Sequence, residues 1–315
     1  MLRATRDAFV GDGSLTERQG AVLVAGSGVM FSLTAIAHAA VEDASDFQFL
    51  TYRGLSTTAA MLALVALRRR HRPVVLTGVT AVTWVASCLL AGTSMLYILA
   101  LSRTSAATTL FLLAAAPIVA ALLGWVWLGE RVVRSTLTAI AVTAVGVGIT
   151  VGAGLEVGSA VGLALAGLIP VTVGTYSVLM RSASQVDPVV PTLIAGSVLG
   201  VGATIVALGQ GGIVVSLRDA ALACTSGGVA LGFGLPMFNL GHRSVAAARV
   251  PLLLMTEVVL APLWVWIWPG EVPSPATLVG GAVILGAVVW LMLGSHPDAP
   301  VAAPSSPVPL VPDDA

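Results

Sequence analysis

Lysine is absent from this 315-residue sequence, and all fifteen of its basic residues are arginine. A Walker A loop places a lysine on the phosphates of its nucleotide, so the sequence excludes an ATP-driven pump within this chain. Retinal and pyridoxal cofactors are bound as Schiff bases of lysine, which excludes proteins of those classes as well. Any work that the chain does is therefore expected to need neither its own ATP hydrolysis nor a lysine-bound cofactor.

Charged residues of either sign are also scarce. They make up 10% of the sequence, whereas 57% is hydrophobic and the formal net charge is zero. A soluble domain carries about 25% charged residues, and the mean hydropathy here is +0.98. We therefore expect an integral membrane protein surrounded by lipids. A neutral chain lacks the basic surface that attracts nucleic acids, so no nucleic-acid partner is expected.

Cysteine and histidine are too few to suggest a metal centre. The two cysteines, Cys88 and Cys224, both lie in apolar runs, where single thiols usually behave as small hydrophobic groups. A disulfide between them is not expected. The four histidines show no HExxH motif and no other paired spacing that binds a metal. The sequence thus predicts no metal site and no cofactor.

Long apolar runs are abundant. Crossing a bilayer takes about 20 mostly apolar residues, and short polar breaks separate the runs of that length. The sequence predicts an all-α membrane protein of ten spans, at 21–41, 48–67, 75–96, 105–128, 134–153, 159–180, 188–208, 219–240, 247–268 and 275–294.

The placement of the arginines predicts the orientation of the chain, because cytoplasmic loops carry the positive excess. With residues 1–19 inside, only Arg103 and Arg218 face outward, and Arg53 and Arg249 lie within spans. Ten spans then leave both termini in the cytoplasm, and the Pro-rich tail 295–315 is expected to be disordered. The composition is typical of a GC-rich bacterial genome, so the inner membrane is the expected location. Eleven arginines face the cytoplasm in this arrangement: Arg3, Arg6, Arg18, Arg68, Arg69, Arg70, Arg72, Arg131, Arg134, Arg181 and Arg243.

An internal repeat divides the chain into halves at 20–153 and 157–294. Shifting the sequence by 141 positions overlays Glu271 on Glu130, and the motif WxWxGE recurs around both residues. Each half contains five predicted spans, an odd number, so the second half must enter the membrane from the opposite side. Secondary transporters use such inverted repeats to open a central site alternately to the two sides.

The sequence resembles the drug/metabolite transporter superfamily, and specifically its EamA-type transporters of ten helices. The resemblance covers about residues 20–294 and departs from the family pattern at Asp46, Val258 and Pro269. It implies a basket of ten helices around a central cavity that moves small metabolites, with export as the expected direction. It rests on three stretches in matching order: ASDFQFLTYRG at 44–54, ALSRTSAATTLFLLAAAPIVAALLGWVWLGE at 100–130, and TEVVLAPLWVWIWPGE at 256–271.

Two charged residues inside predicted spans are candidates for function, because charge within a membrane is costly. Arg53 lies near the outer end of the second span, where it either snorkels to the headgroups or clamps a substrate carboxylate. Glu257 lies near the middle of the ninth span, too deep to snorkel. It is expected either to couple transport to protons or to fix its helix as a structural acid.

Polar and helix-bending residues within the spans complete the candidate site. His38, Trp84, Tyr97, Tyr176 and Asn239 are expected to face the cavity and contact substrate, as are Ser32 and Thr34. Pro117, Gly234 and Pro236 are expected hinges, since proline bends a membrane helix where it lines a cavity. The GxxxG spacings at Gly196–Gly200 and Gly228–Gly232 predict close helix packing.

Three functional classes remain open. The first is a secondary transporter, and exporter, of amino-acid-like or amphipathic drug-like solutes, with proton coupling as an option. The second is a membrane scaffold or sensor without transport. The third is an intramembrane lipid-modifying enzyme, which would need a cluster of catalytic side chains that the spans do not contain, so no enzyme activity is expected. The substrate identity, coupling ion and oligomeric state, including a homodimer, are left open.

Overall fold

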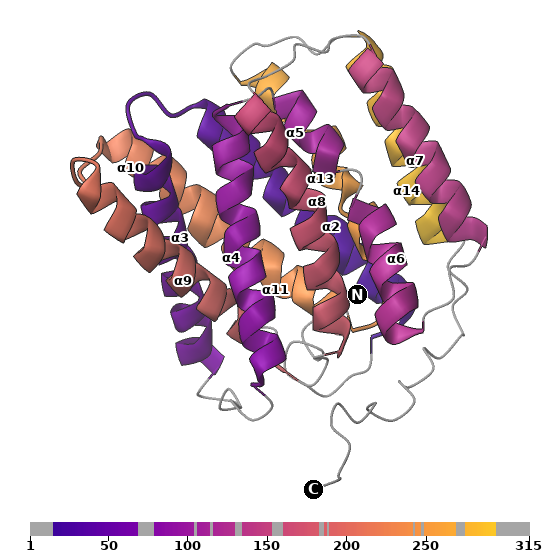
Figure 1. The fold of residues 1–315 in the computed structure, drawn as a ribbon, viewed down its shortest axis with the longest axis horizontal. Helices are drawn as coiled ribbons and strands as arrows, with labels where there is room; N and C mark the ends of the chain where they lie inside the picture. The colour runs from indigo at the N-terminus through magenta and orange to yellow at the C-terminus, as the bar shows by residue number, and fades with distance from the viewer. Residues whose placement is uncertain are drawn as a thin grey trace, which may run out of the picture.

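The computed structural model describes residues 15–68, 79–103, 106–113, 116–129, 134–152, 160–182, 186–187, 189–241, 243–246, 249–268 and 275–293. These residues form a bundle of helices that run roughly side by side, with no strand among them (Figure 1). Within this part of the chain, six helical segments are long and apolar enough to cross a membrane. They are Glu17–Ala39, Asp46–Leu67, Ala81–Leu101, Ala160–Met180, Val189–Gly209 and Leu217–Gly241.

Helices occupy every range in which a span was predicted, although several bounds differ. The first half contains α2 (Glu17–Ala39), α3 (Asp46–Arg68), α4 (Ala81–Leu101), α5 (Ala106–Leu113), α6 (Ala116–Leu128) and α7 (Arg134–Gly152). The second half contains α8 (Ala160–Ser182), α9 (Val189–Gly209), α10 (Leu217–Cys224), the π-helix η1 (Thr225–Leu231), α11 (Gly232–Gly241), α12 (Val250–Leu253), α13 (Met255–Ile267) and α14 (Pro275–Leu293).

Two predicted spans need correction. The third was placed at 75–96, but α4 continues to Leu101 because Tyr97 to Ala100 are buried in the bundle. The ninth range holds the short α12 followed by α13. The tail 295–315 and the glutamates Glu130 and Glu271 lie outside the described residues.

Glycine contacts join the two halves at the crossing of α3 and α9. A Cβ atom on Gly54 would meet the backbone of Gly200, and one on Gly196 would meet Thr57 and Thr58. The two backbones can approach this closely only because these glycines carry no side chain. The packing prediction for the Gly196–Gly200 spacing is therefore confirmed.

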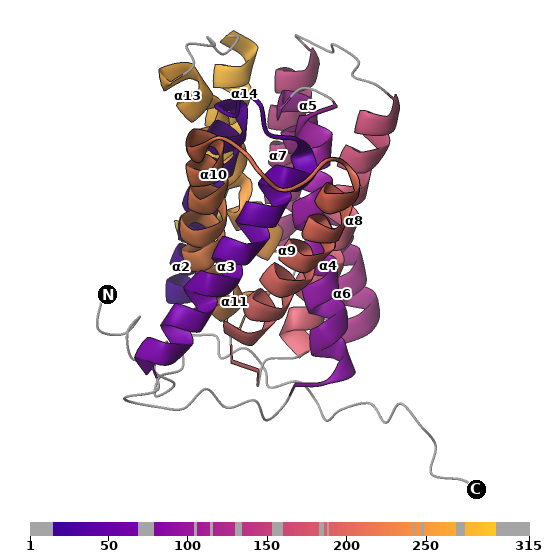
Figure 2. The same ribbon diagram turned by 90° about the vertical axis from the view of Figure 1, so that its left-hand side faces the viewer.

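The loop between α2 and α3 is fastened to the start of α10 by one buried carboxylate. Asp219 accepts hydrogen bonds from the backbone N–H groups of Glu42, Asp43 and Ala44 at 3.0–3.2 Å. Ser216 caps α10 by accepting from the N–H of Asp219 at 3.0 Å. Figure 2 shows this loop and α10 side by side at one end of the bundle. Segments from the two halves are thus tied together at that end.

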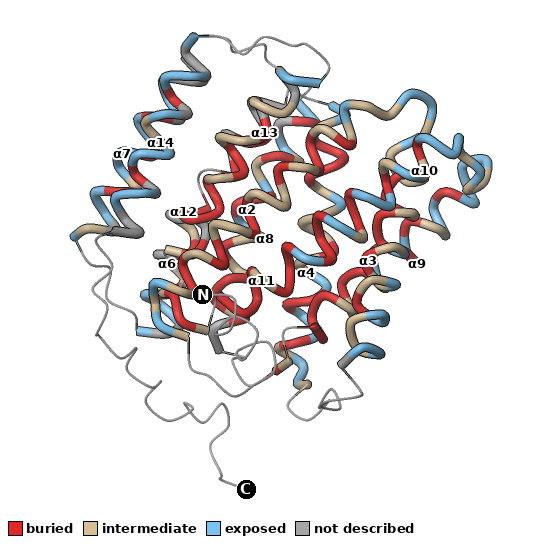
Figure 3. Tube along the Cα trace, turned by 180° about the vertical axis from the view of Figure 1, so that it is seen from behind, coloured by how far each residue is buried: buried red, intermediate tan, exposed pale blue. Residues whose placement is uncertain are grey.

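The helices α7 and α14 form a separate pair at the edge of the bundle. They pack chiefly against each other, and Figure 3 shows them largely exposed while buried residues gather in α2, α3, α4, α8 and α11. Exposed apolar side chains such as Val145 and Leu285 cover this pair, as expected for a surface in contact with lipid. The core of the protein therefore lies in the remaining helices.

Candidate functional site

A cavity of about 100 Å³ lies in the centre of the bundle, between helices of both halves. Most of its wall is apolar, and a small number of polar side chains interrupt it. Its lining consists of Phe31, Thr34, Arg53, Thr57, Leu90, Ala91, Thr93, Ser94, Tyr97, Leu113, Ala116, Ile169, Val173, Tyr176, Ala195, Gly196, Leu199, Leu231, Leu235, Phe238, Leu254, Met255 and Glu257.

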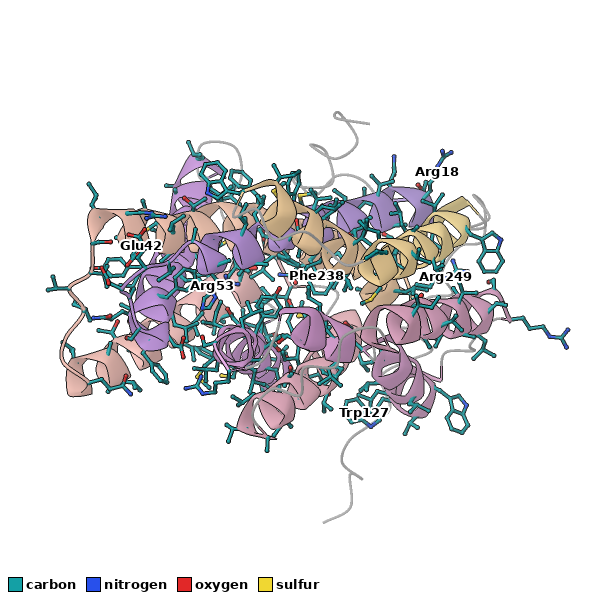
Figure 4. All side chains as sticks on the ribbon, turned by 90° about the horizontal axis from the view of Figure 1, so that it is seen from above. Arg18, Glu42, Arg53, Trp127, Phe238 and Arg249 are labelled. Atoms are coloured by element: carbon teal, nitrogen blue, oxygen red, sulfur yellow. The ribbon has the colours of Figure 1, made fainter. Side chains whose placement is uncertain are left out.

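Arg53 is held in this wall by hydroxyl groups from both halves. Its guanidinium is buried, with 3% of the residue exposed, and Figure 4 shows it directed into the interior between the helices. Nε donates to Ser94 Oγ on α4 at 3.1 Å, and Nη1 donates to Ser226 Oγ on η1. Because the guanidinium is bound to these partners, Arg53 does not snorkel to the lipid headgroups in this structure.

The π-helix η1 brings Ser226 to Arg53. Gly227 packs against the carbonyl oxygen of Arg53, where a Cβ atom would clash, and Thr57 Oγ1 donates to Gly227 O at 3.0 Å. Further along, Pro236 lies inside α11 and cannot donate to the carbonyl one turn before it. Widened π-turns of this kind occur often at functional sites.

Glu257 and Tyr97 lie side by side at the cavity. The Glu257 carboxyl lies close enough to the Tyr97 hydroxyl to interact with it, and the charge of Arg53 acts on both groups. The Tyr97 hydroxyl is buried and has no partner of regular hydrogen-bond geometry among the described residues. Arg53 and Glu257 form no ion pair with each other. Ion pairs among the described residues join Arg103 to Asp46, Arg218 to Glu42 and Arg249 to Glu17.

Aromatic rings form another part of the cavity wall. The rings of Tyr176 and Phe238 stack with centroids 5.7 Å apart, and Phe31 meets Phe238 edge-on at 6.1 Å. The Tyr176 hydroxyl donates to Asn239 Oδ1, and Asn239 Nδ2 donates to Thr192 Oγ1 at 3.1 Å. Asn239 and Thr192 are buried and do not line the cavity. Tyr176 therefore presents its ring to the cavity and keeps its hydroxyl in a separate polar contact.

The structure brings some of the predicted site residues together and leaves others apart. Arg53, Tyr97, Tyr176, Glu257 and Thr34 line the cavity. His38 instead packs edge-on against Phe49 near the loop between α2 and α3, and Ser32 accepts from Trp264 Nε1 at 2.8 Å. Trp84 lies on the outside of α4 with 52% of its surface exposed. Asn239 does not line the cavity and accepts from the Tyr176 hydroxyl.

The three predicted hinge residues lie within helices. Pro117 belongs to α6, and Pro236 lies within α11. Gly234 packs against α2, where a Cβ atom would meet the ring of Phe31. Sequence reasoning missed Ser94 and Ser226, which hold Arg53. Single serines in apolar helices are common, so only their convergence on Arg53 identifies them.

No group of three or more His, Cys, Asp or Glu side chains within the described ranges is arranged to hold a metal ion. Charged and hydroxyl side chains in a largely apolar, buried cavity are instead suited to binding a small organic solute. Together with the six apolar spans, this architecture defines a multi-pass integral membrane protein with a central binding cavity.

Comparison with known proteins shows a similarity to one family. Residues 18–152 match the EamA-like transporter family. The family resemblance predicted from the sequence is thus confirmed over these residues. A solved structure described only as "Crystal structure of protein" superposes with a TM-score of 0.72 at 19% identity, over 88% of this chain and 98% of the other. That likeness concerns the fold alone. No curated protein matches the chain.

Proposed function

We propose that the protein is a secondary transporter, and an exporter, of small amphipathic metabolites such as amino-acid-like solutes. One observation carries the proposal: a buried cavity between the two halves contains one side chain of each charge, Arg53 and Glu257, that are not paired with each other. A solute that bears both charges, or a polar head and an apolar body, complements such a cavity.

Helix packing supports alternating access by two inverted halves. Under the 141-residue shift α3 corresponds to α9 and α7 to α14, and each of these pairs packs together. The packing of α4 on α8 has its counterpart in α11 on α2, and that of α6 on α8 in α13 on α2. Repeats related in this way let a transporter exchange the conformations of its halves around a fixed site.

Glu257 is proposed to couple transport to protons. It lies in a buried wall beside Tyr97 and within the field of Arg53, and a carboxyl group in such a place can gain and lose a proton as access alternates. Arg53 is proposed to orient the anionic part of the solute, because its planar guanidinium can hold a carboxylate through two parallel hydrogen bonds.

The test is transport of radiolabelled L-leucine in proteoliposomes, with and without a pH gradient. Glu257→Gln keeps the shape and hydrogen-bonding capacity of the side chain but cannot titrate. We expect this variant to exchange leucine across the membrane at equilibrium and to lose the response to the gradient. Asp43→Asn, which changes an exposed loop acid outside the cavity, is the matched control.

The outcomes separate the parts of the proposal. Gradient-driven transport by Glu257→Gln at the level of the control would remove Glu257 from coupling while leaving transport itself intact. Absence of flux for leucine and for an amphipathic amine, in wild-type protein shown to be folded, would favour the scaffold or sensor instead.

A further inference from the structure

We infer that the cavity binds an amphipathic solute in one fixed orientation, with the polar group against Tyr97 and the apolar group against Phe238. The inference rests on the proposed function and adds to it which wall recognises which end of the solute. It makes Tyr97 and Phe238 the specificity-determining pair.

The cavity is lined by equivalent residues from the two halves. Five pairs of lining residues are related by the 141-residue shift of the repeat: Leu90 and Leu231, Ser94 and Leu235, Tyr97 and Phe238, Leu113 and Leu254, and Ala116 and Glu257. A symmetric cavity would present the same chemistry on both sides of its pseudo-two-fold axis. It could then accept a solute equally well in two opposite orientations.

In three of these pairs, one residue is polar and the other is apolar. Ser94, Tyr97 and Glu257 are polar, whereas their counterparts Leu235, Phe238 and Ala116 are apolar. The other two pairs are leucine on both sides. Polarity therefore breaks the symmetry of the cavity.

The polar residues of these three pairs gather on one wall of the cavity. Ser94 accepts from Arg53 Nε at 3.1 Å, and Glu257 and Arg53 both interact with Tyr97. Tyr97 is 6% exposed, and its hydroxyl has no regular hydrogen-bond partner among the described residues. A buried hydroxyl without a well-formed hydrogen bond is costly, and a polar group of a bound solute would give it a further partner.

Phe238, the counterpart of Tyr97 in the second half, belongs to an apolar wall. Phe238 contacts the rings of Tyr176 and Phe31, and Figure 4 places Phe238 in the interior of the bundle. The only hydroxyl on these three rings, that of Tyr176, is bound to Asn239. Nothing polar on these rings is left to compete for an apolar group of the solute.

The test is equilibrium binding to purified protein in detergent, measured by competition against radiolabelled L-leucine. A head series keeps the isobutyl group and varies the polar end: leucine, leucinol and isopentylamine. A tail series keeps the amino-acid head and varies the side chain: leucine, norvaline, threonine and alanine. Tyr97→Phe and Phe238→Tyr each change one hydroxyl at equivalent positions. Tyr52→Phe removes a hydroxyl outside the cavity, which donates to Ile213 O at 3.0 Å.

We expect Tyr97→Phe to weaken leucine binding about three- to ten-fold, the effect of one lost hydrogen bond, and to compress the differences within the head series. The tail series should shift as a block, with its order unchanged. Phe238→Tyr should do the converse, improving threonine relative to leucine while the head series keeps its order. Tyr52→Phe should leave the order of both series unchanged.

Two results would overturn the inference. One is that Tyr97→Phe changes the order within the tail series as much as within the head series. The other is that Phe238→Tyr leaves the ratio of threonine to leucine binding unchanged. If the wild-type protein binds no member of either series, the orientation and the amino-acid-like substrate class both fail; if it binds and transports leucine but the variants do not separate, only the orientation fails.

Discussion

Arg53 connects the two halves of the protein through a single side chain. Its guanidinium bonds Ser94 in the first half and Ser226 in the second half at the same time. A planar fork with several fixed donors can hold two partners in different directions, whereas a lysine ammonium is a compact charge on a flexible stem. The geometry of the guanidinium therefore matters here as well as its charge.

Arg53→Lys is predicted to keep the charge in the cavity and to lose one of the two serine contacts. We expect leucine affinity to fall about ten-fold, in line with about 1.5 kcal/mol for a hydrogen bond to a charged group, while insertion into the membrane stays normal. Competition binding measures the affinity. Arg18→Lys, an exposed arginine near the start of α2, serves as the control and should bind as wild type. Equal affinity for the two variants would return Arg53 to a role in folding alone.

The sequence identified the charged members of the site and could not identify their neighbours. Arg53 and Glu257 are recognisable because ionisable residues are rare inside membranes. Tyr97 and Tyr176 were also predicted, yet their opposite roles depend on where each hydroxyl points. Trp84 was grouped with them because an indole suits a cavity as well as a lipid interface. Only packing distinguishes the two, and Trp84 lies on the outside of α4.

At the scale of helices, α3 and α9 cross in close contact between the halves. Both helices use small residues there, and the Gly54 and Gly200 backbones face each other without intervening side chains. Association of membrane helices depends on such close packing, because lipid tails offer no hydrophobic driving force between helices. The crossing is thus expected to be sensitive to one added methyl group.

Gly200→Ala is predicted to destabilise the protein by about 1–3 kcal/mol, the usual cost of overpacking. The added Cβ atom would lie 2.9 Å from the backbone nitrogen of Leu55, so the helices must move apart. Thermal unfolding in detergent measures the effect. Gly202→Ala lies on the same helix with nothing within 4 Å of the new atom, and it should be neutral. Equal melting temperatures for both variants would contradict the account of the crossing.

Helix positions were largely predictable from the sequence, and helix interruptions were not. Apolar runs of sufficient length gave a range for each helix, and α7 and α14 match their predicted ranges within a residue or two. The π-helix η1 left no clear signal beyond the glycines and Pro236 around it. Its widened turn depends on α3 packing against Gly227, which is a contact between segments far apart in the sequence.

At the scale of the whole molecule, the proposed inversion of the two halves predicts on which side of the membrane equivalent residues lie. Trp127 is the second-last residue of α6 and Trp268 directly follows α13. The 141-residue shift overlays one on the other. Both side chains are more than half exposed. If the halves are inverted, these two equivalent residues must lie on opposite sides of the bilayer.

Cysteine labelling can decide the point. Cys88 and Cys224 are both exposed and free, so they can be replaced by alanine at little cost to packing. In that background we expect Trp127→Cys to react with an impermeant thiol reagent only from the cytoplasmic side and Trp268→Cys only from the outside. Labelling of both from one side would exclude the inverted repeat, whatever the transport assays give.

The length of α2 has a consequence for how the protein fits its bilayer. This helix has 23 residues, about 35 Å at 1.5 Å per residue, which is more than the roughly 30 Å of the hydrocarbon region. The helix must therefore tilt to fit. Phe31 and Thr34 of α2 line the cavity. Thickening the bilayer relieves this tilt, so lipid chain length acts on the wall of the cavity through α2.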